Sequence, residues 1–185
     1  MEIIIKDIPE EGLKLHFDST VDEWFQKALV DSLGENYKRE DHGNANFFLM
    51  RTGENVACDG AVSCDAYPTC SRCSKAFCHP LNIPIHLTLA PLYDNDRELT
   101  LESKEEVELV KEDLEFTFYD ADRFDLAAVI REQIILELPM QPVCKEDCKG
   151  LCSTCGSDLN EGECGCEPKQ ADLRWAPLQK LKNKQ

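Results

Sequence analysis

The sequence has little that would place the chain in or across a membrane. No run of apolar residues approaches about 18, the length that a transmembrane helix needs. The opening residues Met1–Lys6 lack the basic start and the long apolar stretch of a secretory signal peptide. We therefore expect a cytoplasmic protein with no membrane partner.

Basic residues and histidines are also scarce. The 185 residues include 20 Lys and Arg against 36 Asp and Glu, which gives a formal net charge of −16. Such a surface, taken as a whole, disfavours non-specific binding to phosphates. His16, His42 and His86 are isolated in the sequence, with no Ser and Asp pattern that would indicate a catalytic triad. We expect no enzymatic activity and no small-molecule substrate.

Cysteine, by contrast, is abundant. The chain has 11 cysteines. Six of them fall within a short run: Cys144, Cys148, Cys152, Cys155, Cys164 and Cys166. Without an export signal we expect a reducing compartment, where clustered thiols bind metal rather than form disulfides. Two residues separate Cys152 from Cys155, and Gly156 follows, which is the spacing of a zinc knuckle.

A second cysteine pair with the same spacing, Cys70 and Cys73, lies far upstream. A tetrahedral zinc takes four sulfur ligands, so eight cysteines indicate two zinc ions. The spacing favours one compact site of Cys152, Cys155, Cys164 and Cys166, and one long-range site of Cys70, Cys73, Cys144 and Cys148. A single site of Cys70, Cys73, Cys152 and Cys155 is the alternative arrangement. Spacing alone leaves iron open as the metal.

Hydrophobic periodicity predicts several short strands and two main helices. Apolar alternation favours strands at Glu2–Lys6, Leu13–Phe17, Asn46–Arg51, Val56–Tyr67, Phe77–Leu92 and Leu114–Tyr119. Helical spacing favours a helix at Asp22–Leu33, with Thr20 as its candidate cap. A second helix is expected at Asp125–Leu138, capped by Asp125, and Ile135 and Leu136 make it apolar enough that we expect it to be well buried. A short terminal helix is expected at Leu173–Lys182.

This order of elements predicts an α+β fold. We expect a mostly antiparallel β-sheet or partial barrel with two main helices and a C-terminal zinc-binding appendage. Residues 1–139 would form the α+β core domain, with an acidic loop at about 93–113. Residues 140–185 would form a cysteine-rich zinc-binding segment with a basic C-terminal tail.

Charge is unevenly distributed along the chain. Residues 93–125 hold 13 acidic and 4 basic residues, which we interpret as a solvated surface loop. Positive charge gathers in the cysteine-rich segment and the tail, so any RNA contact is expected there. The candidate RNA-binding residues are Arg72, Lys145, Lys149, Arg174, Lys180 and Lys182. Arg72, between two thiolates, is equally a candidate to support the metal site.

Three segments of the chain match patterns of a known family. One is a strand that leads into Cys70-Ser-Arg-Cys73 and a nearby Phe77. Another is the helix at Asp125–Leu138, which enters a Leu-Pro. The third is Gly150-Leu-Cys152-Ser-Thr-Cys155-Gly-Ser-Asp-Leu-Asn160, together with the later Asp172–Leu178. These segments resemble the bacterial YceD family, the large ribosomal RNA subunit accumulation proteins, over roughly residues 56–180. The chain departs from the family's usual pattern at Ser74 and Leu173.

The resemblance implies a non-enzymatic ribosome-biogenesis factor. It would be needed for accumulation or processing of 23S ribosomal RNA, and hence for assembly of the large subunit. Its partner would be a ribosomal RNA precursor or a large-subunit ribosomal protein. One alternative is a zinc-ribbon adaptor in transcription or protein assembly. Another is a thiol redox protein that uses Cys70 and Cys73, although such a pair belongs at a helix N-terminus and strands flank this one.

Overall fold

The computed structural model describes residues 1–91, 116–119 and 122–167. The expected acidic loop at about 93–113 and the expected helix at Leu173–Lys182 lie outside these residues. The chain divides into two compact units. The first unit comprises Met1–Pro68 and Cys78–Met140, and the second comprises Thr69–Phe77 and the segment that begins at Gln141. The domain boundary after residue 139 stays a prediction.

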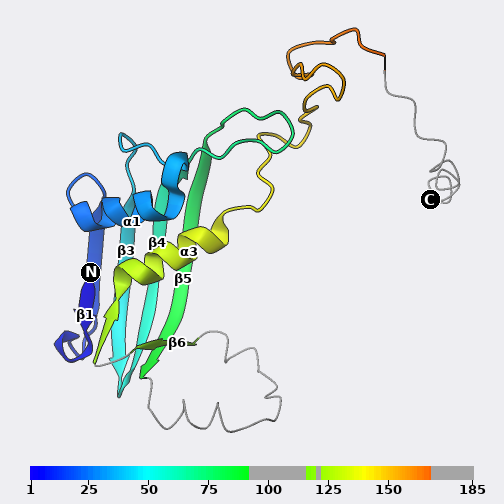
Figure 1. The fold of residues 1–185 in the computed structure, drawn as a ribbon. Helices are drawn as coiled ribbons and strands as arrows, with labels where there is room; N and C mark the ends of the chain where they lie inside the picture. Colours follow the sequence, from blue (N-terminus) through cyan, green and yellow to red (C-terminus); the bar gives the residue numbers. More distant parts are fainter. Residues whose placement is uncertain (92–115, 120–121, 168–185) are drawn as a thin grey trace, which may run out of the picture. The chain divides into compact units, whose positions relative to one another are not determined.

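A five-stranded sheet forms the centre of the first unit (Figure 1). In spatial order its strands are β2 (Leu13–Asp18), β3 (Asn44–Thr52), β4 (Asn55–Ala66), β5 (His79–Pro91) and β6 (Phe116–Tyr119). The first three pairings are antiparallel, whereas β5 and β6 are parallel. A separate antiparallel pair joins β1 (Glu2–Ile4) to β7 (Arg123–Asp125).

Two α-helices, α1 (Glu23–Leu33) and α3 (Leu126–Glu137), lie on one face of this sheet (Figure 1). Single 3-10 turns, η1 (Ile5–Asp7) and η2 (Gly34–Asn36), follow β1 and α1. Alternate residues of each strand point to the same side, so every second residue of β4 and β5 faces the helices. The fully buried side chains include Phe25, Leu29, Leu49, Ile85, Ile130 and Ile134.

The predicted α+β class is confirmed, with two α-helices and a mostly antiparallel sheet among the described residues. Among the described strands the sheet does not close into a barrel, because β2 and β6 form its two edges. The parallel pairing of β5 and β6 was not predicted, and neither was β7. In the described part of the chain no helix has the length and apolar character needed to cross a bilayer.

The two helices begin differently from each other. Asp125 is the N-cap of α3 as predicted, and its carboxylate accepts a hydrogen bond from the Ala127 N–H at 3.0 Å. The candidate cap Thr20 of α1 is wrong, because the helix begins after Asp22. Thr20 donates its hydroxyl to Asp18 instead, and the Asp22 carboxylate accepts from the Asp18 N–H at 2.9 Å. Local side-chain hydrogen bonds thus accompany a shift of the N-cap of α1 by two residues, from Thr20 to Asp22.

The predicted burial of α3 holds for one of its faces only. Ile135 is 56% exposed and Leu136 is 71% exposed. The face of α3 that packs on the sheet is formed by Leu126, Val129, Ile130 and Ile134. The next two positions after Ile134 are turned by about 100° and 200° around the helix axis and therefore leave that face.

Candidate metal centre

The second unit contains a tight turn around the first cysteine pair. The Cys70 N–H donates to the Lys75 carbonyl at 2.8 Å, and the Ser74 N–H donates to the Cys70 carbonyl at 2.9 Å. Ser74 has φ +58°, a left-handed conformation that L-residues rarely adopt. Thr69 and Ala76 pair across the base of the turn. The turn holds both thiols of the pair on one side of a short hairpin.

The same turn recurs around the second pair. The Cys152 N–H donates to the Ser157 carbonyl at 2.8 Å, and the Gly156 N–H donates to the Cys152 carbonyl at 2.9 Å. Gly156 has φ +74°, at the position equivalent to Ser74. Leu151 and Asp158 pair across its base. The two segments, 69–76 and 151–158, are therefore two copies of one knuckle.

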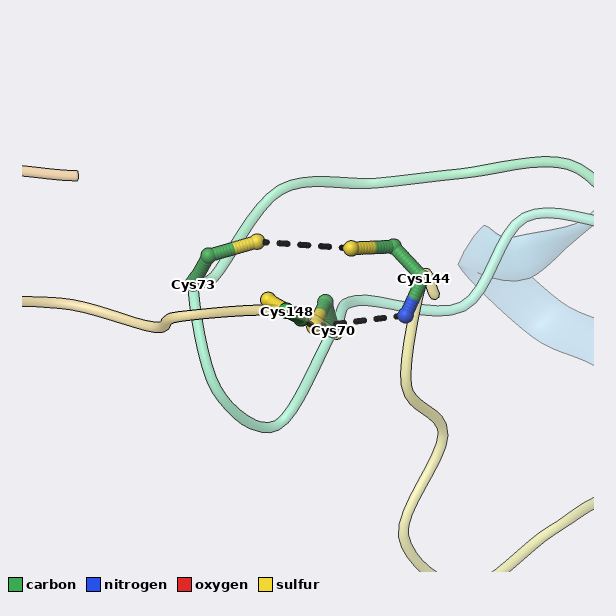
Figure 2. A group of neighbouring side chains, drawn as sticks. All are labelled: Cys70, Cys73, Cys144 and Cys148. Atoms are coloured by element: carbon green, nitrogen blue, oxygen red, sulfur yellow. Dashed lines mark hydrogen bonds between the residues drawn. The ribbon is translucent and has the colours of Figure 1, made fainter. Parts of the chain in front are cut away.

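The first knuckle brings its cysteines to Cys144 and Cys148, as Figure 2 shows. The four sulfur atoms all lie within 4.8 Å of one another. The Cys70 and Cys148 sulfurs are 3.9 Å apart, and those of Cys73 and Cys144 are 3.8 Å apart. These distances are far above the roughly 2.05 Å of a disulfide. Cys70, Cys73 and Cys148 are buried and Cys144 is half-buried, so we name these four residues the inner cluster.

The second knuckle brings its cysteines to Cys164 and Cys166. These four sulfurs also lie within 4.8 Å of one another. Cys155 is exposed and the other three are half-buried, so we name this group the outer cluster. The alternative grouping of both knuckles around one ion is not the arrangement that the structure adopts. Each cluster can hold a metal ion.

The chemistry of the inner cluster favours a cation. The Cys144 N–H donates to the Cys70 sulfur at 3.4 Å, and this bond, together with backbone hydrogen bonds from Cys73 and Arg72, lowers the pKa of Cys70 to about 6. Burial, together with the neighbouring thiols, raises the pKa of Cys144 to about 12. One thiolate therefore forms readily, while further ionisation is opposed by the charge already present. A bound cation would remove that opposition.

The outer cluster shows the same contrast. A hydrogen bond with the Ser157 hydroxyl, at 3.2 Å, lowers the pKa of Cys155 to about 6. The adjacent Cys155 thiol raises the pKa of Cys166 to about 12. The Thr154 N–H donates to the Cys152 sulfur at 3.4 Å. Backbone and hydroxyl groups thus favour the first thiolate, as they do in the inner cluster.

The chain matches the family described as Large ribosomal RNA subunit accumulation protein YceD over residues 58–182, more than half of its length. It belongs to the YceD family. All eight cluster cysteines lie within the matched range. No solved structure matches the chain.

Several relatives of this YceD-family chain occur in bacteria and plants. An uncharacterised protein of Mycobacterium tuberculosis is 33% identical over 125 residues, which are 68% of this chain and 55% of the relative. A protein of Zea mays named "Large ribosomal RNA subunit accumulation protein YCED homolog 1, chloroplastic" is 44% identical over 54 residues, 28% of this chain and 18% of the relative. A chloroplastic protein of the same name from Arabidopsis thaliana is 32% identical over 63 residues, 34% of this chain and 20% of the relative. The chain spans about half the length of the mycobacterial relatives that it matches.

The expected RNA-binding residues differ in their surroundings. The Arg72 guanidinium donates from Nη1 to the Glu146 carbonyl at 3.0 Å and to the Cys148 carbonyl at 3.1 Å. It therefore ties the first knuckle to the chain that carries Cys148. Lys145 and Lys149 are exposed, and the Lys145 amine lies 3.9 Å from the Asp147 carboxylate. Arg174, Lys180 and Lys182 lie outside the described residues. RNA binding by all six residues stays a prediction.

The remaining cysteines belong to the first unit. Cys58 and Cys64 are buried on the inward side of β4. Burial raises the pKa of Cys58 to about 12 and that of Cys64 to about 11. Cys78 is exposed. Both buried thiols are therefore neutral members of the apolar core.

The outward face of the sheet carries side-chain pairs that the sequence did not reveal. His86 and Asp59 are 2.9 Å apart through Nδ1 and Oδ1, and His16 and Asn46 are 2.7 Å apart. A hollow of about 530 Å³ is lined by residues of β2, β3 and β4, His16, Asn46 and Asp59 among them. Strand register brings these residues together, since Asp59 pairs with His86 and His16 pairs with Asn46. His16 and His86, which are isolated in the sequence, therefore each have a polar partner in the fold.

Proposed function

We propose that this chain is a non-enzymatic ribosome-biogenesis factor braced by two zinc ions. Its role would be to support the accumulation or processing of 23S ribosomal RNA, and through it the assembly of the large subunit. The observation that carries the proposal is the YceD-family match across residues 58–182, which takes in both cysteine clusters. The plant relatives carry the same description in their names.

Two clusters of four thiols are compatible with zinc, and the sulfur separations in the inner cluster support it. Bonds of about 2.3 Å from a tetrahedral zinc to four sulfurs place neighbouring sulfurs about 3.8 Å apart. The two measured separations in the inner cluster are 3.9 and 3.8 Å. The proposed ligands are Cys70, Cys73, Cys144 and Cys148 for one ion, and Cys152, Cys155, Cys164 and Cys166 for the other. Four thiolates close the coordination sphere and leave no position for an activated water, so the metal has a structural role.

The proposed partner is a ribosomal RNA precursor or a large-subunit ribosomal protein in the cytoplasm. The exposed amines of Lys145 and Lys149 support this proposal, because both stand beside inner-cluster cysteines in the sequence. Amines held on a metal-braced loop can approach phosphates without loss of much chain entropy. Lys180 and Lys182 would add contacts from the tail. Neutralising Lys145, Lys149, Lys180 and Lys182 together without any change in binding would contradict this mode of action.

The experiment that tests the function is the ratio of 23S to 16S ribosomal RNA in cells depleted of the protein. Expression of the wild type should restore a reduced ratio. The Cys152→Ser variant should fail to restore it, whereas Cys78→Ser, which alters an exposed cysteine outside both clusters, should succeed. An unchanged ratio on depletion would contradict the proposal and favour the zinc-ribbon adaptor.

The geometry gives little support to the redox alternative. The first knuckle is a turn of a short hairpin, with no helix beginning at Cys70. A redox dithiol draws its low pKa from a helix N-terminus in a βαβ setting. Thiol reactivity separates the two cases, because a redox pair reacts at once whereas a zinc site reacts only after chelation.

A further inference from the structure

The two knuckles of the second unit are joined by more than the chain between them. Only Lys149, Gly150 and Leu151 separate Cys148 of the inner cluster from Cys152 of the outer one. The Leu151 N–H donates to the Arg72 carbonyl at 3.0 Å. Gly150, with φ +73°, lies so close that an added Cβ would be 2.9 Å from the same carbonyl oxygen. The second knuckle is thus docked on the backbone of the first.

Asn160 connects the two clusters through its side chain. It belongs to the loop Asp158–Glu161, which lies in the sequence between the outer-cluster ligands Cys155 and Cys164. Its Nδ2 donates to the sulfur of Cys148, an inner-cluster residue, at 3.4 Å. Its Oδ1 accepts from the Lys149 N–H at 2.9 Å. Asp158 holds it in place, because Oδ1 of Asp158 accepts from both nitrogens of Asn160.

Lys75 makes a second connection, from the first knuckle to the loop that carries Asn160. It stands in the first knuckle, and its amine lies 2.9 Å from the Asp158 carboxylate and also pairs with Glu161. The Asp158 side chain is only 9% exposed. Hydrogen bonds from Lys75 and Asn160 lower the pKa of Asp158 to about 2. The loop that carries Asn160 is therefore held by groups from both knuckles.

We propose that the two clusters form one coupled metal centre in which Asn160 is the positioning residue. A metal held by the outer cluster orders Asp158–Glu161, and Asn160 then donates to the Cys148 thiolate and strengthens metal binding by the inner cluster. Four thiolates around a divalent cation leave two negative charges in excess, so each N–H donor stabilises the loaded cluster. The inference rests on the metal binding put forward under Proposed function.

Zinc affinity measured on the full-length chain tests the coupling. Competition with a chromophoric chelator gives the wild-type affinity for two ions. The variant C164S/C166S reports the inner cluster alone, and C70S/C144S reports the outer cluster alone. Cobalt(II) absorption confirms that each variant keeps its remaining four-sulfur site intact. Coupling means that the wild-type affinity exceeds the product of the two single-cluster affinities, by roughly 10–100-fold.

Asn160→Asp identifies the residue responsible. The change keeps the size of the side chain but replaces the N–H donor with a carboxylate oxygen that repels the thiolate. In this variant the affinity for two ions should equal the product of the two single-cluster affinities, so that the excess disappears. The outer cluster alone should keep its affinity and its cobalt spectrum. Asn82→Asp is the matched control, because it adds the same charge in the first unit on β5. It should leave the excess unchanged.

Two results would overturn the inference, and they differ from each other. If the wild-type affinity equals the product of the single-cluster affinities, the clusters are independent although both bind zinc. If the excess persists in Asn160→Asp, the coupling passes through another contact and Asn160 is not its positioning residue. Failure of the wild type to bind zinc or cobalt at either cluster would contradict the metal part of the proposed function itself.

Discussion

The two units of this chain are stabilised in different ways. The first has a core of apolar side chains contributed by the sheet, α1 and α3. The second has as its core three cysteines, Cys70, Cys73 and Cys148, with Phe77, Val143 and Cys144 packed against them. Apolar burial of that size stabilises a fold only weakly, since small domains are limited by the surface they can bury. The comparison therefore predicts that the second unit depends on bound metal and the first does not.

Metal removal should show the difference between the two units most clearly. A strong chelator should abolish the hydrogen-exchange protection of the backbone amides in both knuckles. These include the Cys70 N–H, which donates to the Lys75 carbonyl, and the Cys152 N–H, which donates to the Ser157 carbonyl. Protection in β4 and β5 should remain. Structural zinc contributes about 10–16 kcal/mol to such folds, far more than the few apolar contacts present. Knuckle amides that stay protected without metal would contradict the dependence.

Alkylation with iodoacetamide at pH 8 should sort the cysteines into three groups. With metal bound, only the exposed Cys78 should react. After chelation nine cysteines should react, because the eight cluster thiols become free. Cys58 and Cys64 should react only on unfolding, since burial raises their pKa values to about 12 and 11 and leaves few thiolates. Mass spectrometry counts the labels, and early labelling of Cys58 would show that the core of the first unit opens.

The same two thiols predict an alkaline limit for the first unit. Their folded pKa values lie above the ordinary value of 9.0. Below pH 9 the thiols are neutral in both states, so their contribution to stability is fully present. It is lost as the pH rises from about 9 through 11 and 12, because the unfolded chain releases its protons first. The midpoint of urea denaturation should fall over this range, and by less in Cys58→Ala.

A cavity in the core should affect the first unit only. Ile130→Ala removes a fully buried side chain from α3. We expect a loss of about 2–5 kcal/mol in the free energy of unfolding, measured by urea denaturation. Zinc affinity should not change, because Ile130 belongs to the first unit. The surface change Ile135→Ala, on the exposed side of the same helix, is the control and should cost much less.

The smallest expected effect compares the two knuckles with each other. Ser74→Gly should stabilise the first knuckle by about 0.5–1 kcal/mol, because glycine adopts φ +58° without strain. Ser153→Gly is the matched control, since Ser153 is outside the positive-φ positions found in the described residues. It should have no stabilising effect. The rate of zinc release to a chelator measures both, and equal rates for the two variants would contradict the strain at Ser74.

The periodicity of the sequence predicted most elements of the first unit. Alternation placed β4 and β5 within a few residues of their observed ends, and helical spacing did the same for α1 and α3. The failures have local causes. Asp22 is the N-cap of α1 in place of Thr20, because both residues form side-chain hydrogen bonds with Asp18. Ile135 is apolar but exposed, because it does not face the sheet. The periodicity of apolar residues indicates which residues share a face of a helix or strand. It does not indicate which side chains each residue will contact.

The sequence by itself determined the α+β class, the knuckle spacing and the resemblance to the YceD family, because these depend on residue type and separation along the chain. Only the tertiary structure decided between the two groupings of thiols that spacing left open, since Cys70 and Cys148 are 78 positions apart and their sulfurs lie 3.9 Å apart. It also decided that Ser74 and Gly156 occupy the same position of two equal turns. The tertiary structure likewise decided the hydrogen bond from Asn160 to the Cys148 sulfur. A hydrogen bond between segments depends on how they are packed, which residue spacing does not encode.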